Sequence, residues 1–265
     1  MSNSVIYTPR GAAREYAAWA CNVYKGCTHG CFYCFGPDVM HVEKDAFRKN
    51  IQTRGDDFLK RLEKDARRES HEGTAYFQVH LCFVTDSYQP IEDELQITRK
   101  TIEILHKWRL QVAVLTKGGT RALRDIDLFG PGDAMAATMT FATEADSLKY
   151  EPGAALPQDR FEALKEFHKK GVPTWISCEP VLDVQQTLYL IQMMHEVVDH
   201  VKVGKLNHDS KREAEINWRK FGKDAIFQLE NLGYKRILSP DEAVLSNATN
   251  RTYYVKQALA KFLEA

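Results

Sequence analysis

Three cysteines stand close together near the start of the chain, with the spacing C-x3-C-x2-C over Cys27, Cys31 and Cys34. Thiolates are soft ligands that suit iron–sulfur clusters or zinc. A cubane cluster has four irons, so three cysteines leave one iron without a protein ligand. An open iron is a site for reaction, whereas a cluster that only transfers electrons is normally closed by a fourth cysteine. The spacing therefore predicts a reactive metal centre.

An aromatic residue, Tyr33, precedes the last cysteine, and the resulting pattern resembles the signature of the radical S-adenosylmethionine (SAM) superfamily. Its members hold a [4Fe–4S] cluster on three cysteines, and SAM chelates the fourth iron. Reduction of the cluster cleaves SAM to methionine and a 5′-deoxyadenosyl radical, which abstracts hydrogen from a substrate. The resemblance implies that Cys27, Cys31 and Cys34 are the cluster ligands and that Tyr33 lies near the adenine of SAM.

Zinc is the main alternative to a cluster, because a histidine would complete a Cys3His tetrahedron. His29 lies within the cysteine loop and His41 follows it. A zinc-binding regulator would use such a site, and a redox sensor with an exposed cluster would bind no SAM. Disulfides are not expected, because six cysteines form no dense framework in 265 residues and we recognise no secretory signal or membrane span. We expect a cytoplasmic protein in a reducing compartment.

The composition favours one folded α/β domain with a substantial core, because 44% of the 265 residues are hydrophobic. The 36 basic and 36 acidic residues cancel. This balance argues against a broadly cationic surface that binds DNA.

Short β-branched runs alternate with longer helical patterns after the cysteine loop, which predicts βα units with parallel strands. The predicted strands are 18–24, 75–84, 111–115, 134–141, 172–177 and 200–203. The predicted helices are 56–68, 92–108, 121–128, 158–170 (ended by Gly171), 184–198 and 217–231, with a last strand and helix within 253–263.

Six βα units with right-handed crossovers curl into an open, partial (β/α)6 barrel of the TIM type. The six-unit barrel is also what the radical SAM resemblance implies. We assign residues 1–210 to this barrel and residues 211–265 to a short α/β extension packed on it, within a single structural domain.

Polar residues follow several predicted strands, where the functional residues of α/β barrels gather. The segments are Thr85-Asp86-Ser87, Thr116-Lys117-Gly118-Gly119, Thr140-Phe141-Ala142-Thr143, Ser177-Cys178-Glu179 and Gly204-Lys205-Leu206-Asn207. Such a rim suits a polar ligand better than a set of structural loops.

The rim sequences resemble the spore photoproduct lyase-like branch of the superfamily and its uncharacterised bacterial and phage relatives, over about residues 24–207. The shared elements are Asn22-x-Tyr24-Lys25-Gly26-Cys27, Thr85-Asp86-x-Tyr88-Gln89-Pro90-x-Glu92, Thr98-Arg99, Thr116-Lys117, Arg124-Asp125, and Glu151-Pro152-Gly153 followed by Arg160. The resemblance implies that Lys117 pairs with the carboxylate of SAM.

Further contacts to SAM follow from the chemistry of the rim. Thr85, Asp86 and Ser87 are candidates to accept from the SAM ammonium, although the Gly-Gly-Glu motif of many family members is absent. Helix capping is the alternative for Asp86. Thr143 and Glu179 are candidates for the ribose hydroxyls or for the substrate. Glu151-Pro152-Gly153 reads as a turn.

A cysteine near the end of the second strand returns a hydrogen atom in spore photoproduct lyase, and Cys82 stands in the same strand here. Alignment on Thr85-Asp86, however, places the lyase cysteine opposite Phe83, and one residue reverses the direction of a strand side chain. Cys82 and Cys178, the latter beside Glu179, are therefore both candidate redox residues. An inert buried thiol is the alternative for Cys82.

The substrate is not identified by the sequence, and we expect a polar molecule, with nucleic acid or a nucleotide-derived compound as one option. Cations and aromatics in the extension suit base stacking: Trp218, Arg219, Lys220, Lys223, Tyr234, Lys235, Arg236, Tyr253 and Tyr254. The resemblance implies a flavodoxin or ferredoxin as electron donor.

Overall fold

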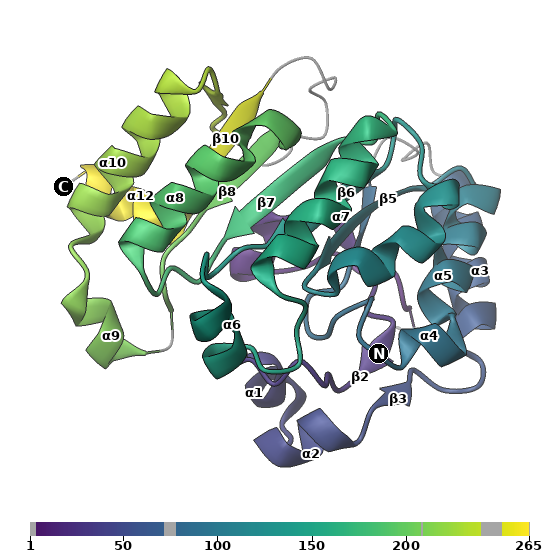
Figure 1. The fold of residues 1–265 in the computed structure, drawn as a ribbon. Helices are drawn as coiled ribbons and strands as arrows, with labels where there is room; N and C mark the ends of the chain where they lie inside the picture. Colours follow the sequence, from purple (N-terminus) through teal and green to yellow (C-terminus); the bar gives the residue numbers. More distant parts are fainter. Residues whose placement is uncertain (1–3, 72–77, 208, 240–250, 265) are drawn as a thin grey trace.

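A computed structural model describes residues 4–71, 78–207, 209–239 and 251–264, and these ranges form one parallel sheet with helices on its outer face (Figure 1). Within them the sheet has eight strands in the order β1-β4-β5-β6-β7-β8-β10-β9. Their bounds are β1 Trp19–Ala20, β4 Gln78–Leu81, β5 Gln111–Thr116, β6 Ala134–Thr138, β7 Thr174–Cys178, β8 His200–Val203, β10 Thr252–Val255 and β9 Lys235–Arg236. Every neighbouring pair is parallel.

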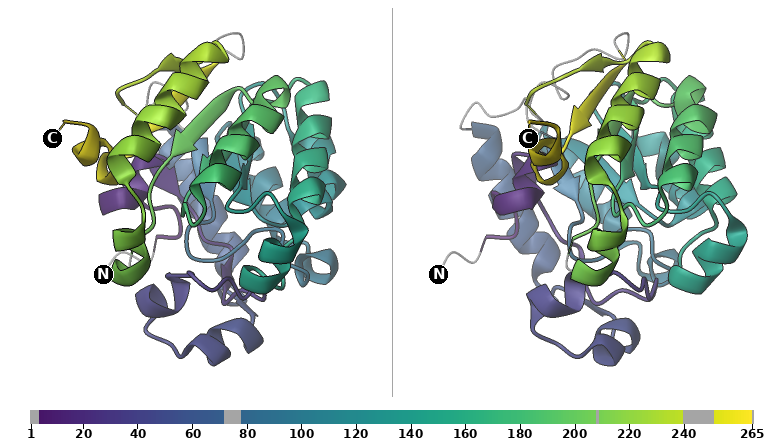
Figure 2. Two further views of the ribbon diagram at one scale, coloured as in Figure 1. Left: turned by 60° about the vertical axis from the view of Figure 1, so that its left-hand side comes forward. Right: turned by 90° about the vertical axis from the view of Figure 1, so that its left-hand side faces the viewer.

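Longer helices connect the strands and cover the outer face of the sheet (Figures 1 and 2). They are α3 Phe58–His71, α5 Ile97–Lys107, α7 Pro157–Lys169, α8 Val184–Met194, α10 Trp218–Asn231 and α12 Gln257–Glu264. Alternate strand residues such as Val112, Val114 and Ile176 pack with Leu105 and Phe167 from these helices. The opposite, concave face carries Ala113, Ala136 and Trp175.

Short elements complete the described structure, and several gather at the edge of the sheet where the cysteine loop lies (Figure 1). They are η1 Gly11–Glu15, β2 Tyr24–Lys25, α1 Gly36–Met40, α2 Lys44–Lys49, β3 Gln52–Thr53, α4 Glu92–Leu95, η2 Gly119–Leu128, α6 Glu144–Tyr150, η3 His195–Val197 and α9 Ser210–Glu215. β2 and β3 pair antiparallel as a separate ribbon.

The predicted sequence of βα units is confirmed, and strand 200–203 has its predicted bounds. Gly171 takes a positive φ of 81° directly after Lys170, the C-cap of α7, as expected of a glycine that ends a helix. Beyond the six expected barrel strands, the sheet is extended at the β8 edge by β10 and then β9. The proposed division at residue 210 stays a prediction, although β10 pairs directly with β8.

Two predicted elements are divided by side chains that bind the backbone. The strand predicted over 18–24 becomes β1 and β2, because Asn22 Oδ1 accepts hydrogen bonds from the amides of Phe83 (2.9 Å) and Val84 (3.1 Å) and replaces the sheet ladder. The helix predicted over 92–108 breaks at Gln96, where φ is 51°. Both carboxylate oxygens of Glu92 lie 3.0 Å from the amide of Thr98 and cap the second helix, α5.

Other boundaries differ by a few residues. The predicted helix 121–128 is a 3-10 helix, and helix 184–198 ends at Met194 before η3. Predicted strand residues 75–77 lie outside the described residues. The helices α1, α2, α6 and α9 were not predicted, because each spans only five to seven residues and has no periodic apolar stripe to mark it.

Candidate functional site

The cysteine loop lies at the carboxyl edge of the sheet, and its three thiols line one small pocket of about 20 Å³. Cys27 and Cys31 are buried, with 9% and 7% of their surface exposed, whereas Cys34 is half-buried. Gly26, at φ 79°, brings the loop against α2: an added Cβ would lie 2.7 Å from the Phe47 carbonyl oxygen. Burial raises the pKa of the Cys31 thiol to about 11, against the opposing effect of the Lys117 ammonium.

The donor set of this pocket fits an iron–sulfur cluster, because three free thiols share one opening and thiolates are its normal ligands. Two buried polar atoms of the loop, Thr28 Oγ1 and His29 Nε2, have no hydrogen-bond partner in the described structure. Over the same residues, no three His, Cys, Asp or Glu side chains are already arranged around a common point as metal ligands. The cysteines therefore share a pocket but do not form a preshaped metal cage.

Asp86 joins the cysteine loop to the end of β5. Its carboxylate accepts hydrogen bonds from Thr116 Oγ1 (2.5 Å) and from the amides of Lys117 (2.7 Å) and Tyr88 (2.8 Å), and it lies 3.5 Å from His29 Nδ1. Burial alone would raise the pKa of Asp86, but His29 and these donors outweigh burial and lower it. The contacts occupy both oxygens, so Asp86 positions the loop, and its contact with the SAM ammonium stays a prediction.

Glu151 forms a second link to the loop. It is 1% exposed, pairs with the equally buried Arg160 at 2.5 Å and accepts a hydrogen bond from the Tyr33 hydroxyl. The Tyr33 hydroxyl also lies 3.0 Å from Thr140 Oγ1, after β6. The sequence suggested only a turn at Glu151. The pattern shared with the lyase-like proteins contains both Glu151 and Arg160, and it was the one signal in the sequence that could have pointed to their pairing.

The turn after Glu151 packs directly on the cysteine loop. The Gly153 amide donates to the His29 carbonyl at 2.9 Å, and a Cβ on Gly153 would stand 2.3 Å from the Thr28 carbonyl oxygen. Only a residue without a side chain allows this approach.

Lys117 follows β5 and places an ammonium near Tyr33 of this network. Its Nζ lies 5.4 Å from the centre of the Tyr33 ring and forms no hydrogen bond or ion pair within the described ranges. Burial by itself would lower the pKa of Lys117, but Cys31 and Glu151 outweigh it and raise the pKa. A charged, unpaired ammonium beside the cysteine pocket suits an anionic ligand group.

The hydroxyl groups of the other predicted SAM contacts differ in whether they already have a hydrogen-bond partner. Thr85 Oγ1 is buried without a partner in the described structure, so its hydroxyl is free for a ligand. Ser87 Oγ lies 3.1 Å from Cys82 Sγ. Thr143 Oγ1 accepts from the Asp146 amide at 3.2 Å and caps α6. All three roles stay predictions, and only Thr85 has a hydroxyl without a partner.

Cys82 and Phe83 point in different directions. Cys82 Sγ accepts from the Val23 amide at 3.3 Å within the main core, and burial raises the pKa of its thiol to about 11. Phe83 instead stacks on His80, with ring centroids 4.3 Å apart, and contacts Tyr16 on the concave side. The two side chains point apart as expected, but β4 ends at Leu81, so Cys82 and Phe83 follow the strand and do not lie within it as predicted. The hydrogen-donor role of Cys82 stays a prediction without geometric support.

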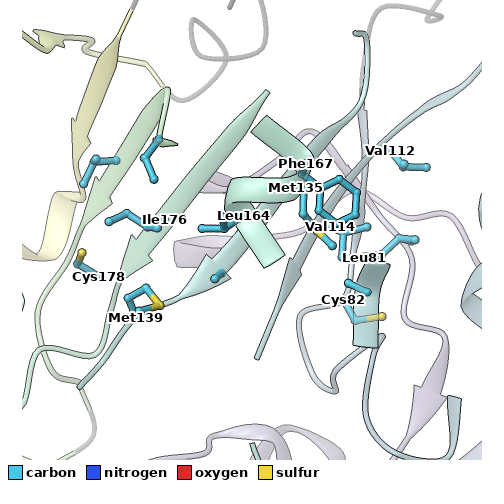
Figure 3. Close-up of a cluster of buried hydrophobic side chains, with 14 of the residues drawn as sticks. Leu81, Cys82, Val112, Val114, Met135, Met139, Leu164, Phe167, Ile176 and Cys178 are labelled. Carbon is cyan, nitrogen blue, oxygen red and sulfur yellow. The ribbon is translucent and has the colours of Figure 1, made fainter. Parts of the chain in front are cut away.

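Cys178 lies on the outer face of β7, within the apolar cluster of Ile176, Met139 and Leu164 (Figure 3). It is fully buried, and burial raises the pKa of its thiol to about 12. The adjacent strand residue Ser177 takes the other face, where its hydroxyl meets Tyr16 at 2.8 Å. The redox role of Cys178 also stays a prediction.

Glu179 belongs to a polar network that closes the rim of β7, β8 and β10. Its carboxylate accepts from Tyr16 Oη at 2.8 Å and Asn207 Nδ2 at 3.1 Å, and it pairs with Lys256. The sequence did not indicate Tyr16 or Lys256, because they come from segments far outside the barrel units. Whether Glu179 contacts ribose or substrate stays a prediction.

Tyr16 occupies the concave face between aromatic and cationic side chains. Its ring lies 6.0 Å from His80 and 6.1 Å from Trp175, and the ammonium groups of Lys202 and Lys256 lie 4.9 and 4.4 Å from its centre. Burial and the Glu179 carboxylate raise the pKa of the Tyr16 hydroxyl well above its ordinary value. The segment after η1 thus fills part of the barrel interior.

Comparison of the sequence with known proteins finds a relative of low identity. No family model matches the chain. An uncharacterized protein of Methanocaldococcus jannaschii is 24% identical over 181 residues, which are 66% of this chain and 65%, just under two thirds, of that relative.

Solved structures are more similar in shape than in sequence. A spore photoproduct lyase mutant has a TM-score of 0.69 at 11% identity, covering 96% of this chain and 79% of that chain. A lyase mutant with bound SAM (AdoMet) and dinucleoside spore photoproduct has a TM-score of 0.67 at 11% identity, covering 94% and 78%. Streptococcus suis SuiB bound to SAM has a TM-score of 0.60 at 9% identity, covering 89% and 49%. The chain therefore has the partial-barrel fold of the radical SAM enzymes, in the form found in spore photoproduct lyase.

Proposed function

We propose that this protein is a radical SAM enzyme that abstracts hydrogen from a substrate not yet identified. The observation that carries the proposal is the C-x3-C-x2-C loop, whose three thiols line one pocket at the carboxyl edge of a radical SAM-type barrel. Parallel barrels place their reactive groups at this edge.

Cys27, Cys31 and Cys34 would hold the [4Fe–4S] cluster. When bound, the cluster supplies an electron that cleaves SAM and generates the 5′-deoxyadenosyl radical. Lys117 binds the SAM carboxylate through its unpaired ammonium, and Tyr33 lies beside the adenine. Asp86 and Glu151 hold the loop in place through buried contacts with His29 and Tyr33.

The substrate class remains part of the proposal. The lyase relative holds a dinucleoside, whereas SuiB is bound to a precursor peptide. Base stacking on the extension loses support, because Trp218, Tyr234, Tyr253 and Tyr254 have no more than 4% of their surfaces exposed. A nucleotide-derived substrate would instead bind at the rim near Tyr16 and Glu179.

Other elements of the proposal concern the cellular context. We propose a flavodoxin or ferredoxin as electron donor and the cytoplasm as the site of action. Among the described helices, none has the length and apolar content needed to cross a bilayer.

Zinc binding is the second candidate function. His29 lines the cysteine pocket, and its Nε2 is buried without a partner in the described structure, so it is available as a fourth ligand. His41 does not support a zinc site, because it ends α1 on the surface and does not line the pocket.

The deciding experiment is anaerobic reconstitution with iron and sulfide, followed by SAM and dithionite, with 5′-deoxyadenosine measured by mass spectrometry. We expect wild type to bind four irons and to form deoxyadenosine, because three thiolates suffice for an open cluster. Cys31→Ala should lose both properties. The matched control is Cys21→Ala, which removes a buried thiol outside the loop and should retain both. A colourless protein with stoichiometric zinc and no deoxyadenosine would favour the regulator.

A further inference from the structure

Large apolar side chains are exposed beside the cysteine pocket. Phe32, Phe35, Val39 and Val42 expose between 44% and 54% of their surfaces, and we call them the loop-side patch. Phe35 and Val39 lie one turn apart at α1, where the Val39 amide donates to the Phe35 carbonyl at 3.2 Å. Exposed apolar groups gathered in one short segment indicate an interaction surface more than scattered ones do.

Two cations stand at the same opening. Lys44 and Arg48 line the pocket together with the three cysteines, and neither forms an ion pair in the described parts of the chain. Lys49 on the same helix, α2, differs, because it pairs with Asp45 at 3.6 Å and does not line the pocket. On α2, the cations that are left without an ion pair are therefore those that line the pocket.

Cys34 is the thiol of the pocket with the most contact with solvent. It is the only half-buried thiol of the three, whereas Cys27 and Cys31 are covered. Electron transfer slows steeply with distance, so a carrier must bring its redox group close to this opening.

We infer that the loop-side patch, with Lys44 and Arg48, is the docking surface for a small acidic electron-carrier protein of the flavodoxin or ferredoxin type. One electron passes from the carrier, which is oxidised, to the cluster, which is reduced, and no bond forms or breaks. The inference rests on the proposed function, since it requires the cluster. An apolar centre beside complementary charges is the usual composition of such interfaces.

A protein partner fits this surface better than a nucleic acid. Residues 32–50 carry three acidic residues and three Lys or Arg residues, so an extended phosphate backbone gains no net attraction there. Only Phe32 and Phe35 of the patch offer rings for base stacking, whereas Val39 and Val42 are aliphatic and offer none. A compact carrier needs attraction only at the pocket, where the two unpaired cations lie.

The test compares reduction of the reconstituted cluster by dithionite, which needs no docking, with reduction by a purified flavodoxin hydroquinone and, separately, a reduced [2Fe–2S] ferredoxin. Bleaching of the cluster absorbance is followed by stopped flow. Val39→Glu and Val42→Glu place a negative charge on the patch, and Lys44→Gln removes an attraction. The matched controls are Tyr189→Glu, on a distant surface that is 60% exposed, and Lys49→Gln.

We expect dithionite to reduce the cluster of Val39→Glu and Val42→Glu as fast as that of wild type. At least one carrier should reduce these two variants at least fivefold more slowly than wild type. Calorimetry should show correspondingly weaker binding of that carrier in its oxidised form. Lys44→Gln should also reduce the dependence of the rate on salt, because a steering charge is lost. The controls should match wild type in every assay.

Equal carrier rates in wild type and both patch variants would overturn the inference while leaving the enzyme proposal intact. Reduction of wild type by dithionite but by neither carrier would also overturn the inference. So would patch variants that lose binding of an oligonucleotide but keep the binding of both carriers. A protein that takes up no iron would overturn the proposed function itself.

Discussion

The buried residues around the cysteine loop differ in how far their bonding capacity is used. Asp86 and Glu151 are occupied by internal donors, whereas the Lys117 ammonium forms no hydrogen bond or ion pair in the described structure. A side chain with an unused charge is a better ligand contact than one whose partners are complete. Among the predicted SAM contacts, Lys117 therefore has the strongest support.

Lys117→Gln should raise the KM for SAM tenfold or more, because a charge-assisted hydrogen bond contributes about 1.5–3 kcal/mol. Iron content should stay unchanged, since Lys117 is not a cluster ligand. Deoxyadenosine formation across SAM concentrations measures the effect, and Lys100→Gln, on the surface of α5, is the control. An unchanged KM would remove Lys117 from the SAM site.

Sequence reasoning at the residue scale predicted one shared site for the three cysteines of the motif, and their thiols line one pocket, whereas their role as cluster ligands stays a prediction. It failed for Tyr16, Lys256 and Glu151, whose partners are brought together only by the folded chain. Tyr16 and Glu179 stand 163 positions apart in the sequence, and no local pattern joins them. Cys82 and Phe83 point in different directions, but both follow β4, which ends at Leu81, so alternation along a strand does not account for this difference.

At the scale of elements, the cysteine loop is held by contacts with segments from several units of the barrel. The Glu151–Gly153 turn and α2 touch it, and the end of β5 is linked to it through Asp86, which contacts His29. The strands and long helices were predictable from their periodic patterns, whereas the short helices that shape the loop were not. The divisions at Asn22 and Gln96 depend on contacts between side chains and the backbone, one long-range and one within six residues, which periodicity does not encode.

Gly153→Ala should disturb the cysteine loop, because the added Cβ would stand 2.3 Å from the Thr28 carbonyl oxygen. We expect lower iron retention after reconstitution and a loss of about 1–3 kcal/mol of stability from the overpacked contact. Gly130→Ala is the matched control, since its nearest neighbour would lie 3.9 Å away. Iron analysis and urea unfolding measure both effects. Equal iron retention in the two variants would contradict the close packing.

At the scale of the whole molecule, the two faces of the sheet have different chemistry. The outer face is apolar and covered by helices, whereas the concave face holds His80, Tyr16, Trp175 and Lys202. His80 is fully buried and neither ring nitrogen has a partner in the described structure. Burial and the Lys202 ammonium lower its pKa to about 3.

This lowered pKa predicts acid sensitivity. His80 is neutral in the folded state but takes up a proton below about pH 6.5 when unfolded. Its contribution to stability is therefore complete above pH 6.5 and is lost as the pH falls from 6.5 towards 3. The loss should approach about 1.4 kcal/mol per pH unit. Urea unfolding of wild type and His80→Phe between pH 7 and 4.5 measures it, and identical slopes would contradict the assignment.

Glu15 ties the beginning of the described structure to its end. Its carboxylate accepts from Tyr254 Oη at 3.0 Å and from the Gln257 amide at 2.7 Å, across 242 positions of sequence. Contacts between such distant positions form slowly, because a long loop must close first. During synthesis on the ribosome, η1 can already meet Lys202 of β8, which donates to the Glu15 carbonyl at 3.0 Å, but the Glu15 carboxylate lacks both of its partners until β10 and α12 have emerged. The closure of the polar interior by the C-terminal segment is therefore among the last steps of folding.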